Sequence, residues 1–311
     1  MQRLRELQRT PARGQRTVGQ QLAVWLGMKR PSVRPSTARQ YDAIIRARLG
    51  EHPRFMGLRL TELDSRSVAE WRDAMTAAGL SGSSVGAALT VLGMALKQAE
   101  RDGLISRNPA TGVAGPRVPA AARRTLSATE VRSIIAERGD PLRALWLVLV
   151  GCGLRIGEAL ALRWRDVDLE RGLLHVTGSM SRGERTEPKT MAARRTLAMP
   201  AFVWAALSNR THHAEQTDGP VFAGIHGRPL DPRWVSRQWH DYCARTGLPQ
   251  IRLHDLRHTC ATLLLGSGAP IDAVKRYMGH TSIAMTSDIY GHGGEDGMPG
   301  LAAVMTERLG R

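Results

Sequence analysis

Apolar residues that recur every three or four positions run through most of the chain, and this spacing favours a mainly helical fold. The longest such series has its apolar residues at Val85, Leu89, Leu92, Leu96 and Ala99. Three shorter series precede it, at 18–26, 41–49 and 68–75. Ser36 and the pair Ser83 and Ser84 are the expected starts of the second and fourth helices, because serine caps helix N-termini well. Four helices of this size predict one small domain.

A stretch rich in proline, glycine and alanine follows at 107–125, with four arginines and no acidic residue. This composition is typical of a linker. A chain of 311 residues is long enough for about two domains. We therefore expect the basic linker to join the helical domain to a second domain.

The region after the linker predicts helices together with a small β ribbon. Ser127 and Glu130 have the spacing of a capping box, which marks a helix start. Helices are expected at about 127–138, 141–150, 153–163, 234–242, 254–267, 271–279 and 282–289. Two short β-rich runs, 173–177 and 195–199, predict an irregular ribbon of two or three strands. The expected fold class is therefore mainly α with a small β ribbon, an α+β arrangement.

Neither a membrane span nor an exported, disulfide-bonded protein fits the sequence. The longest nearly uninterrupted apolar run, 144–154, is about half of what a bilayer crossing needs. The N-terminus lacks the apolar core of a secretory signal peptide. Cys152, Cys243 and Cys260 are widely spaced and form no CxxC pair, so neither a disulfide framework nor a zinc site is expected. These features predict a protein of the cytoplasm.

The charge of the chain indicates a polyanionic partner. The sequence has 44 Lys and Arg residues against 28 Asp and Glu residues, for a formal net charge of +16, and both halves are basic. We favour nucleic acid as the partner over a membrane surface or an acidic protein. Only four of the basic residues are lysines, so the composition of a GC-rich genome is an alternative source of part of this bias.

Two short motifs place basic side chains where they suit a phosphate group. His254 and Arg257 are three residues apart on an expected helix and would share one of its faces. An ordinary solvated helix face is the alternative. Arg155 follows a glycine break at the start of another helix, where free N–H groups favour anions. A simple ion pair with Glu158 is the alternative there.

Further residues add the proton donors and the nucleophile that phosphoryl transfer needs. His280 and Tyr290 supply an imidazole and a phenol. Lys189, on the turn of the β ribbon, is a candidate proton donor because lysine gives up its proton more readily than arginine; a solvated surface lysine is the alternative. No carboxylate cluster suggests a two-metal site, and the absence of a glycine-rich phosphate loop argues against an ATP-driven motor.

Three segments and the helical region 17–105 resemble the tyrosine recombinase (phage integrase) family, over nearly the whole chain. The segments are GCGLRIGEALALRWRDVDL, EPKTMAARRTLAMP and HDLRHTCATLLLGSGAPIDAVKRYMGHTSIAMTSDIYGH. By this resemblance, Arg155 and Arg257 are the two arginines that bind the scissile phosphate. Lys189 is the general acid that protonates the 5′ oxygen.

The same resemblance implies roles for three more residues and an activity. His254 assists proton transfer, His280 donates a hydrogen bond to the scissile phosphate, and Tyr290 forms a 3′-phosphotyrosine. The implied function is that of a site-specific recombinase, or integrase, that cleaves and rejoins duplex DNA through a Holliday junction. The family uses no metal and no ATP, so no cofactor and no cofactor-binding or metal-binding residue is expected.

The implied architecture is a C-shaped clamp on DNA, made by a helical core-binding (SAM-like) domain and a catalytic domain. The expected parts are a basic leader at 1–16, the core-binding domain at 17–106, the linker at 107–125, the catalytic domain at 126–292 and a tail at 293–311. The short leader departs from family members with an added amino-terminal domain that binds arm-type sites, which favours a simpler architecture; DNA contact by the arginines of the leader is the alternative. The tail resembles a segment that docks on a neighbouring protomer; a self-capping tail or a frayed end is the alternative.

The resemblance also implies partners and a location. The partners are double-stranded DNA with core-type attachment sites, a homotetramer on that DNA, and an accessory DNA-bending or directionality factor; no membrane is involved. Viral genome integration, transposon movement and chromosome dimer resolution are the uses open to the family, in the nucleoid of a bacterial host. Charge and placement select four candidate DNA contacts, which are Arg39, Lys97, Arg123 and Arg124.

Two other classes of protein are the alternatives to a recombinase. A type IB topoisomerase uses similar chemistry, but the resemblance in several separate segments favours a recombinase. A DNA-binding protein that has lost catalysis is disfavoured because all six catalytic positions carry suitable residues. Among the other tyrosines, Tyr41 and Tyr242 lie on apolar helix stripes and Tyr277 lies between Val274 and Met278, so burial is expected for all three.

Overall fold

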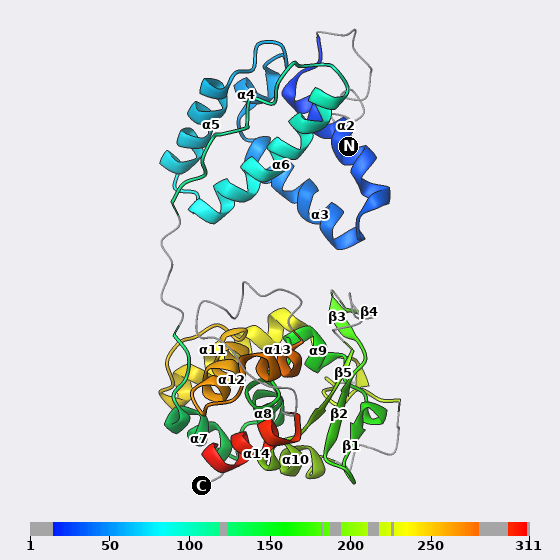
Figure 1. Cartoon of the computed structure of the whole chain (residues 1–311), viewed down its shortest axis with the longest axis vertical. Helices are drawn as coiled ribbons and strands as arrows, with labels where there is room; N and C mark the ends of the chain where they lie inside the picture. The colour runs from blue at the N-terminus through cyan, green and yellow to red at the C-terminus, as the bar shows by residue number, and fades with distance from the viewer. Residues whose placement is uncertain are drawn as a thin grey trace. The chain divides into compact units, whose positions relative to one another are not determined.

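The chain forms two compact units that divide between Ala121 and Ala122. The structure is a computed structural model, and it describes residues 15–117, 124–181, 183–186, 194–210, 218–224, 227–279 and 298–309. Figure 1 shows helices in the first unit and helices with strands in the second. Within these described residues, no helix combines the length and the apolar character needed to cross a membrane.

The first unit is built from helices around one apolar core. Its elements are α2 (Val18–Lys29), η1 (Arg30–Ser32), α3 (Pro35–Ile44), η2 (Ile45–Leu49), α4 (Pro53–Gly57), α5 (Ser65–Ala77) and α6 (Gly82–Arg101). The apolar series predicted from the sequence are buried here, with Leu22, Trp71 and Leu92 at most 3% exposed. The side chain of Gln21 donates a hydrogen bond to the carbonyl of Ala95 at 2.9 Å, which ties α2 to the long helix α6.

Two helices of the first unit start at residues other than those predicted. The helix α3 begins at Pro35, because proline suits the first helical position, and Ser36 does not cap it. The helix α6 is capped by Ser81, whose Oγ accepts a hydrogen bond from the backbone N–H of Ser84 at 3.3 Å. Ser83 and Ser84 therefore lie inside the first turn of α6 instead of starting it.

The second unit combines helices with two small antiparallel sheets. Its helices are α7 (Ala128–Ala136), α8 (Arg143–Gly151), α9 (Ile156–Leu160), η3 (Trp164–Asp166), α10 (Ala201–Ser208), α11 (Pro232–Thr246), α12 (Asp255–Leu265), α13 (Ile271–Met278) and α14 (Met298–Leu309). Every residue of α8 from Ala144 to Gly151 is buried. The predicted capping box is present, since Ser127 and Glu130 exchange hydrogen bonds at the start of α7.

The strands confirm the predicted ribbon and add a hairpin. They are β1 (Val167–Asp168), β2 (Leu173–Val176), β3 (Ser179–Ser181), β4 (Glu184–Thr186) and β5 (Arg195–Ala198). Strand β2 pairs antiparallel with both β1 and β5, with Leu174 opposite Leu197. Strands β3 and β4 form a separate two-stranded sheet. Figure 1 shows the strands gathered on one side of the unit, beside the helices.

The helix α14, inside the predicted tail 293–311, packs on the chain's own second unit. Leu301, Met305 and Leu309 are at most 2% exposed and belong to the same core as α8. The helix contacts α7, α10, α12, α13 and β5, and the guanidinium of Arg132 donates to the carbonyl of Arg308 at 3.1 Å. In this single chain, residues 298–309 therefore lie on their own second unit, and docking of the tail on a neighbouring protomer stays a prediction. The helix predicted at 282–289 lies outside the described residues.

The burial of Met305 predicts that α14 stabilises the second unit. We expect Met305→Ala to lower the free energy of unfolding by about 2–5 kcal/mol, because truncating a buried methionine leaves a cavity. Urea-induced unfolding of the full chain, followed by tryptophan fluorescence, measures this change. The exposed Ala303 on the same helix gives the control variant Ala303→Ser, for which the unfolding midpoint should stay near that of the parent chain. Equal midpoints for both variants would contradict this role of α14.

Candidate active site

Arg155 stands at the N-cap position of α9, after a tight turn that ends α8. Gly153 makes this turn possible because its φ of +59° is in the left-handed region, and an added Cβ would lie 2.5 Å from the Sδ of Met278. The turn brings the start of α9 against the end of α13. The sequence prediction of an arginine at a helix start after a glycine break is confirmed.

The guanidinium of Arg155 has two partners and remains partly open to solvent. Its Nη1 is 2.7 Å from Oε1 of Glu158, and its Nη2 donates to the carbonyl of Gly279 at 3.2 Å. The ion pair with Glu158 that the sequence suggested is therefore present. Because 37% of the Arg155 side chain is exposed, the pair leaves room for a further contact with an anion.

Arg257 lies in α12 and is almost fully buried, at 3% exposed. Its two terminal nitrogens donate to the carbonyls of Gly153 and Met278. Burial, followed by the nearby positive charge of Arg155, lowers the pKa of Arg257. Burial and the charge of Arg155 both disfavour the charged form of Arg257. A negative group between the two guanidiniums would stabilise that form, so this arrangement favours anion binding.

Glu158 is a buried carboxylate that two arginines share. Its Oε1 faces Arg155, and its Oε2 is 3.0 Å from Nη2 of Arg195. Burial by itself would raise the pKa of Glu158, but the charge and hydrogen bond of Arg195, followed by those of Arg155, outweigh it and lower the pKa. Glu158 is therefore a carboxylate over the physiological pH range.

Arg195 is a site residue that the sequence analysis did not predict. It begins β5, and its side chain is only 5% exposed. Its Nε donates to the carbonyl of Tyr277 at 2.9 Å. The sequence places Arg195 two residues before Leu197, on the same face of an expected strand, and this could have indicated that Arg195 is buried. Alternation alone, however, does not distinguish a buried arginine from an exposed one.

His254 immediately precedes α12 and is exposed. Its ring lies perpendicular to that of His258, with the ring centres 5.1 Å apart. Partial desolvation, followed by the charges of His258 and Arg257, lowers the pKa of His254. The neutral imidazole is thus favoured near neutral pH, a form that can accept a proton. His254 and Arg257 differ in exposure, because Arg257 is buried in α12 whereas His254 is exposed at its N-cap position.

Some of the remaining predicted site residues lie within the described part of the chain, and others lie outside it. Lys189, His280, Tyr290 and Arg123 lie outside the described residues. Of the other candidate DNA contacts, Arg39 and Lys97 are exposed in the first unit. Arg124 is exposed in the second unit and forms an ion pair with Glu130 at 3.0 Å.

The other three tyrosines are packed against apolar neighbours. Tyr242 and Tyr277 are at most 1% exposed, which confirms their predicted burial. Tyr41 is half-buried, with its ring centre 5.2 Å from that of Trp25. Burial raises the pKa of Tyr242 to about 12 and also raises that of Tyr277, so neither is a ready nucleophile. Within the described part of the chain, no three His, Cys, Asp or Glu side chains are grouped to hold a metal ion.

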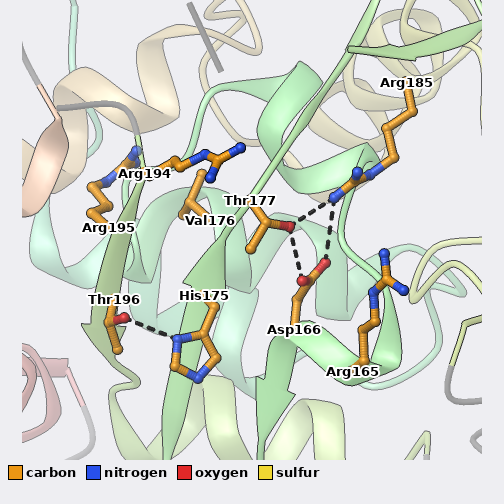
Figure 2. Close-up of a pocket in the computed structure, with 9 residues that line it drawn as sticks. All are labelled: Arg165, Asp166, His175, Val176, Thr177, Arg185, Arg194, Arg195 and Thr196. Atoms are coloured by element: carbon orange, nitrogen blue, oxygen red, sulfur yellow. Dashed lines mark hydrogen bonds and ion pairs between the residues drawn. The ribbon is translucent and has the colours of Figure 1, made fainter. Parts of the chain in front are cut away.

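A polar pocket of about 600 Å³ borders the site at Arg195. Its lining residues, drawn in Figure 2, are Arg165, Asp166, His175, Val176, Thr177, Arg185, Arg194, Arg195 and Thr196. The Nη2 of Arg185 donates to Oγ1 of Thr177 at 2.7 Å, and that hydroxyl donates to Asp166 at 2.8 Å. These contacts join β4 to η3 and to the residue that follows β2.

Comparisons with known proteins agree with these features. Residues 124–295 match the phage integrase family. The chain is 33% identical over 238 residues to the tyrosine recombinase XerC of Mycobacterium sp. (strain KMS). The aligned region covers 71% of this chain and 76% of that relative.

Two solved structures share the fold. The Tn1549 transposon integrase in complex with a circular intermediate DNA matches with a TM-score of 0.78 and 23% identity, over 94% of this chain and 99% of that one. A lambda integrase tetramer bound to a Holliday junction matches with a TM-score of 0.68 and 18% identity, over 86% of this chain and 78% of that one. By its family match and its sequence relatives, the chain belongs to the phage integrase family and is a tyrosine site-specific recombinase.

Proposed function

We propose that this recombinase cleaves duplex DNA by attack of the Tyr290 hydroxyl on the scissile phosphorus. The P–O bond to tyrosine forms, the P–O5′ bond breaks, and a 3′-phosphotyrosine and a 5′ hydroxyl result. The observation that carries this proposal is the meeting of Arg155 and Arg257 at the carbonyls of Met278 and Gly279, just before His280 and Tyr290 in the sequence.

The two arginines suit the charge that develops in this reaction. Guanidinium groups bind non-bridging phosphate oxygens through paired hydrogen bonds and stabilise the added negative charge of the transition state. Arg155 and Arg257 come from different helices, and the fold brings the two guanidinium groups to neighbouring carbonyls at the end of α13. Arg257 is fixed by burial, whereas Arg155 keeps part of its guanidinium exposed.

Three residues complete the proposed chemistry. Lys189 donates a proton to the leaving 5′ oxygen, His254 assists proton transfer, and His280 donates a hydrogen bond to the scissile phosphate. The phosphotyrosine conserves the energy of the broken phosphodiester. An incoming 5′ hydroxyl can therefore reverse the step and join a new strand without ATP.

The proposed substrate is a core-type attachment site in double-stranded DNA. Residues 17–106 and 126–292 are proposed as the core-binding and catalytic domains, joined by the basic linker 107–125. We further propose a tetramer that exchanges strands in pairs through a Holliday junction, on the model of the lambda integrase tetramer. Integration of viral DNA in the nucleoid of a bacterial host, with an accessory DNA-bending or directionality factor, is the use we propose.

A covalent adduct on a nicked suicide substrate tests this function. The DNA, drawn from the flanks of the encoding gene, carries a nick so that a short fragment diffuses away after cleavage and religation is blocked. We expect a protein–DNA adduct on a denaturing gel. Mass spectrometry should identify the peptide that contains Tyr290 as the one that carries the DNA. An unnicked duplex is the control and should give far less adduct. Specific binding without any adduct would instead favour a DNA-binding protein that has lost catalysis.

The proposed general acid gives a separate prediction. Lys189→Ala should slow single-turnover cleavage by about 10²–10⁴-fold, the usual contribution of a general acid. DNA with a bridging 5′ sulfur at the scissile position should restore most of this rate, because a thiolate leaves without a proton. The control is Lys275→Ala, since Lys275 pairs with Asp272 on α13 and has no proposed part in the reaction. A rate that the sulfur does not restore would assign Lys189 a structural role.

A further inference from the structure

Three arginines from three different elements hold three consecutive carbonyls where α13 ends. Arg195 of β5 donates to the carbonyl of Tyr277, Arg257 of α12 donates to that of Met278, and Arg155 donates to that of Gly279. Cations at a helix C-terminus are favourable because the last carbonyls carry the negative end of the helix dipole. The last turn of α13 is therefore fixed by side chains from outside the helix.

The surroundings of Arg195 are shaped closely around its side chain. Gly279 ends α13 with a φ of +65°, and an added Cβ there would lie 2.8 Å from Nη1 of Arg195. Only glycine fits that position without moving the guanidinium. The side chain of Arg195 is 5% exposed, against 37% for Arg155, and its guanidinium is held by Glu158 and by the carbonyl of Tyr277.

Arg195 also determines how Arg155 uses its partner Glu158. Arg195 occupies Oε2 of Glu158, while Nη1 of Arg155 occupies Oε1. Because Oε2 also accepts from the backbone N–H of Arg155 at 3.1 Å, it already has two donors. The Arg155 guanidinium therefore forms a one-oxygen contact in place of the two-oxygen, parallel pair that arginine and carboxylate prefer. Its Nη2 is directed instead to the carbonyl of Gly279, on the side where the phosphate is proposed to bind.

We infer that Arg195 is a positioning residue for DNA cleavage, acting through Glu158 on Arg155 and through the Tyr277 carbonyl on the end of α13. This inference rests on the proposed function of Arg155. Without Arg195, Glu158 takes both terminal nitrogens of Arg155, and the guanidinium turns away from the scissile phosphate. Arg195 itself contacts neither the substrate nor the reacting atoms.

The adjacent residue provides a matched control for the test. Arg194 precedes Arg195 directly and lines the polar pocket of Figure 2, but it is exposed. Arg195→Gln should reduce the cleavage rate at saturating suicide substrate by about 10–100-fold, the range expected when a catalytic group is misplaced by about 1 Å. Arg194→Gln should leave that rate within about twofold, as for an ordinary surface substitution. DNA binding, measured by gel shift, should stay near the parent value in the Arg195 variant.

A double-variant cycle separates positioning from a general loss of structure. If Arg195 acts through Arg155, then Arg195→Gln combined with Arg155→Lys should cleave no more slowly than Arg155→Lys alone. If Arg195 had a purely structural role, the fold-reductions in cleavage rate of Arg195→Gln and Arg155→Lys would multiply in the double variant. Arg195→Lys guards against a misfolded glutamine variant, because lysine keeps the buried charge but cannot hold Glu158 and the Tyr277 carbonyl with one planar group; its cleavage rate should fall between those of the parent and Arg195→Gln.

Two results would overturn the inference. One is a cleavage rate in Arg195→Gln equal to that of Arg194→Gln, and the other is multiplying losses in the double variant. These are distinguishable from failure of the proposed function, because that failure removes the Tyr290 adduct from the parent chain itself. A parent chain that forms the adduct, with Arg195 variants that cleave normally, would contradict only the positioning role.

Discussion

Tyr290→Phe is expected to abolish covalent attachment to DNA while leaving site-specific binding intact. The change removes one oxygen, the proposed nucleophile, and keeps the ring. Loss of a catalytic nucleophile lowers rates by about 10⁴-fold or more, so no adduct should form on the suicide substrate during a normal assay. A denaturing gel measures the adduct, and a native gel shift on the same DNA measures binding.

A second tyrosine serves as the control for this prediction. Tyr41 is half-buried in the first unit beside Trp25, and Tyr41→Phe should give as much adduct as the parent chain. If Tyr290→Phe still forms the adduct, the nucleophile is another residue. If it loses DNA binding together with the adduct, Tyr290 contributes to binding of the site before it contributes to chemistry.

Arg257→Lys is expected to reduce the cleavage rate by about 10²–10³-fold, the cost of losing one preorganised donor to a developing charge. Lysine retains the positive charge but lacks the planar fork that reaches the carbonyls of Gly153 and Met278 and a phosphate oxygen together. Single-turnover cleavage at saturating DNA measures this loss, and circular dichroism checks that the helical fold is retained.

The same substitution at a nearby arginine isolates the effect of position. Arg252 lies just before α12, has a side chain that is 67% exposed and pairs with Asp255. Arg252→Lys should therefore leave the cleavage rate near that of the parent chain. Equal rates for Arg257→Lys and Arg252→Lys would show that the buried guanidinium has no special part in cleavage.

Helices with a one-sided apolar pattern were predictable from the sequence. The regular spacing in α6 and the capping box at Ser127 identified two of them, and the paired runs in β2 and β5 were also found. The helix α10 was missed because its residues Phe202, Val203, Trp204 and Ala205 are apolar in succession, so no periodicity marks a helix. The strands β3 and β4 have three residues each, too few for alternation to be recognised.

The candidate site was predictable only where local sequence determines it. Glu158 lies one helical turn from Arg155, so their ion pair follows from spacing alone. Arg195 bonds to Glu158 and to the end of α13, contacts that join segments far apart in the chain. No local pattern encodes such a contact, because it depends on how β5 packs against α13.

The three-arginine cluster means that the cost of assembling the cationic centre is met when the chain folds. Arg155, Arg195 and Arg257 are held by one carboxylate and three backbone carbonyls, which offset part of their mutual repulsion within the protein. Because these dipoles and charges are already oriented, little reorganisation is needed as charge builds up on a phosphate. Part of the stability of the second unit is thereby exchanged for a lower barrier to strand cleavage, because the remaining repulsion among the three guanidiniums is already present in the folded chain before DNA binds.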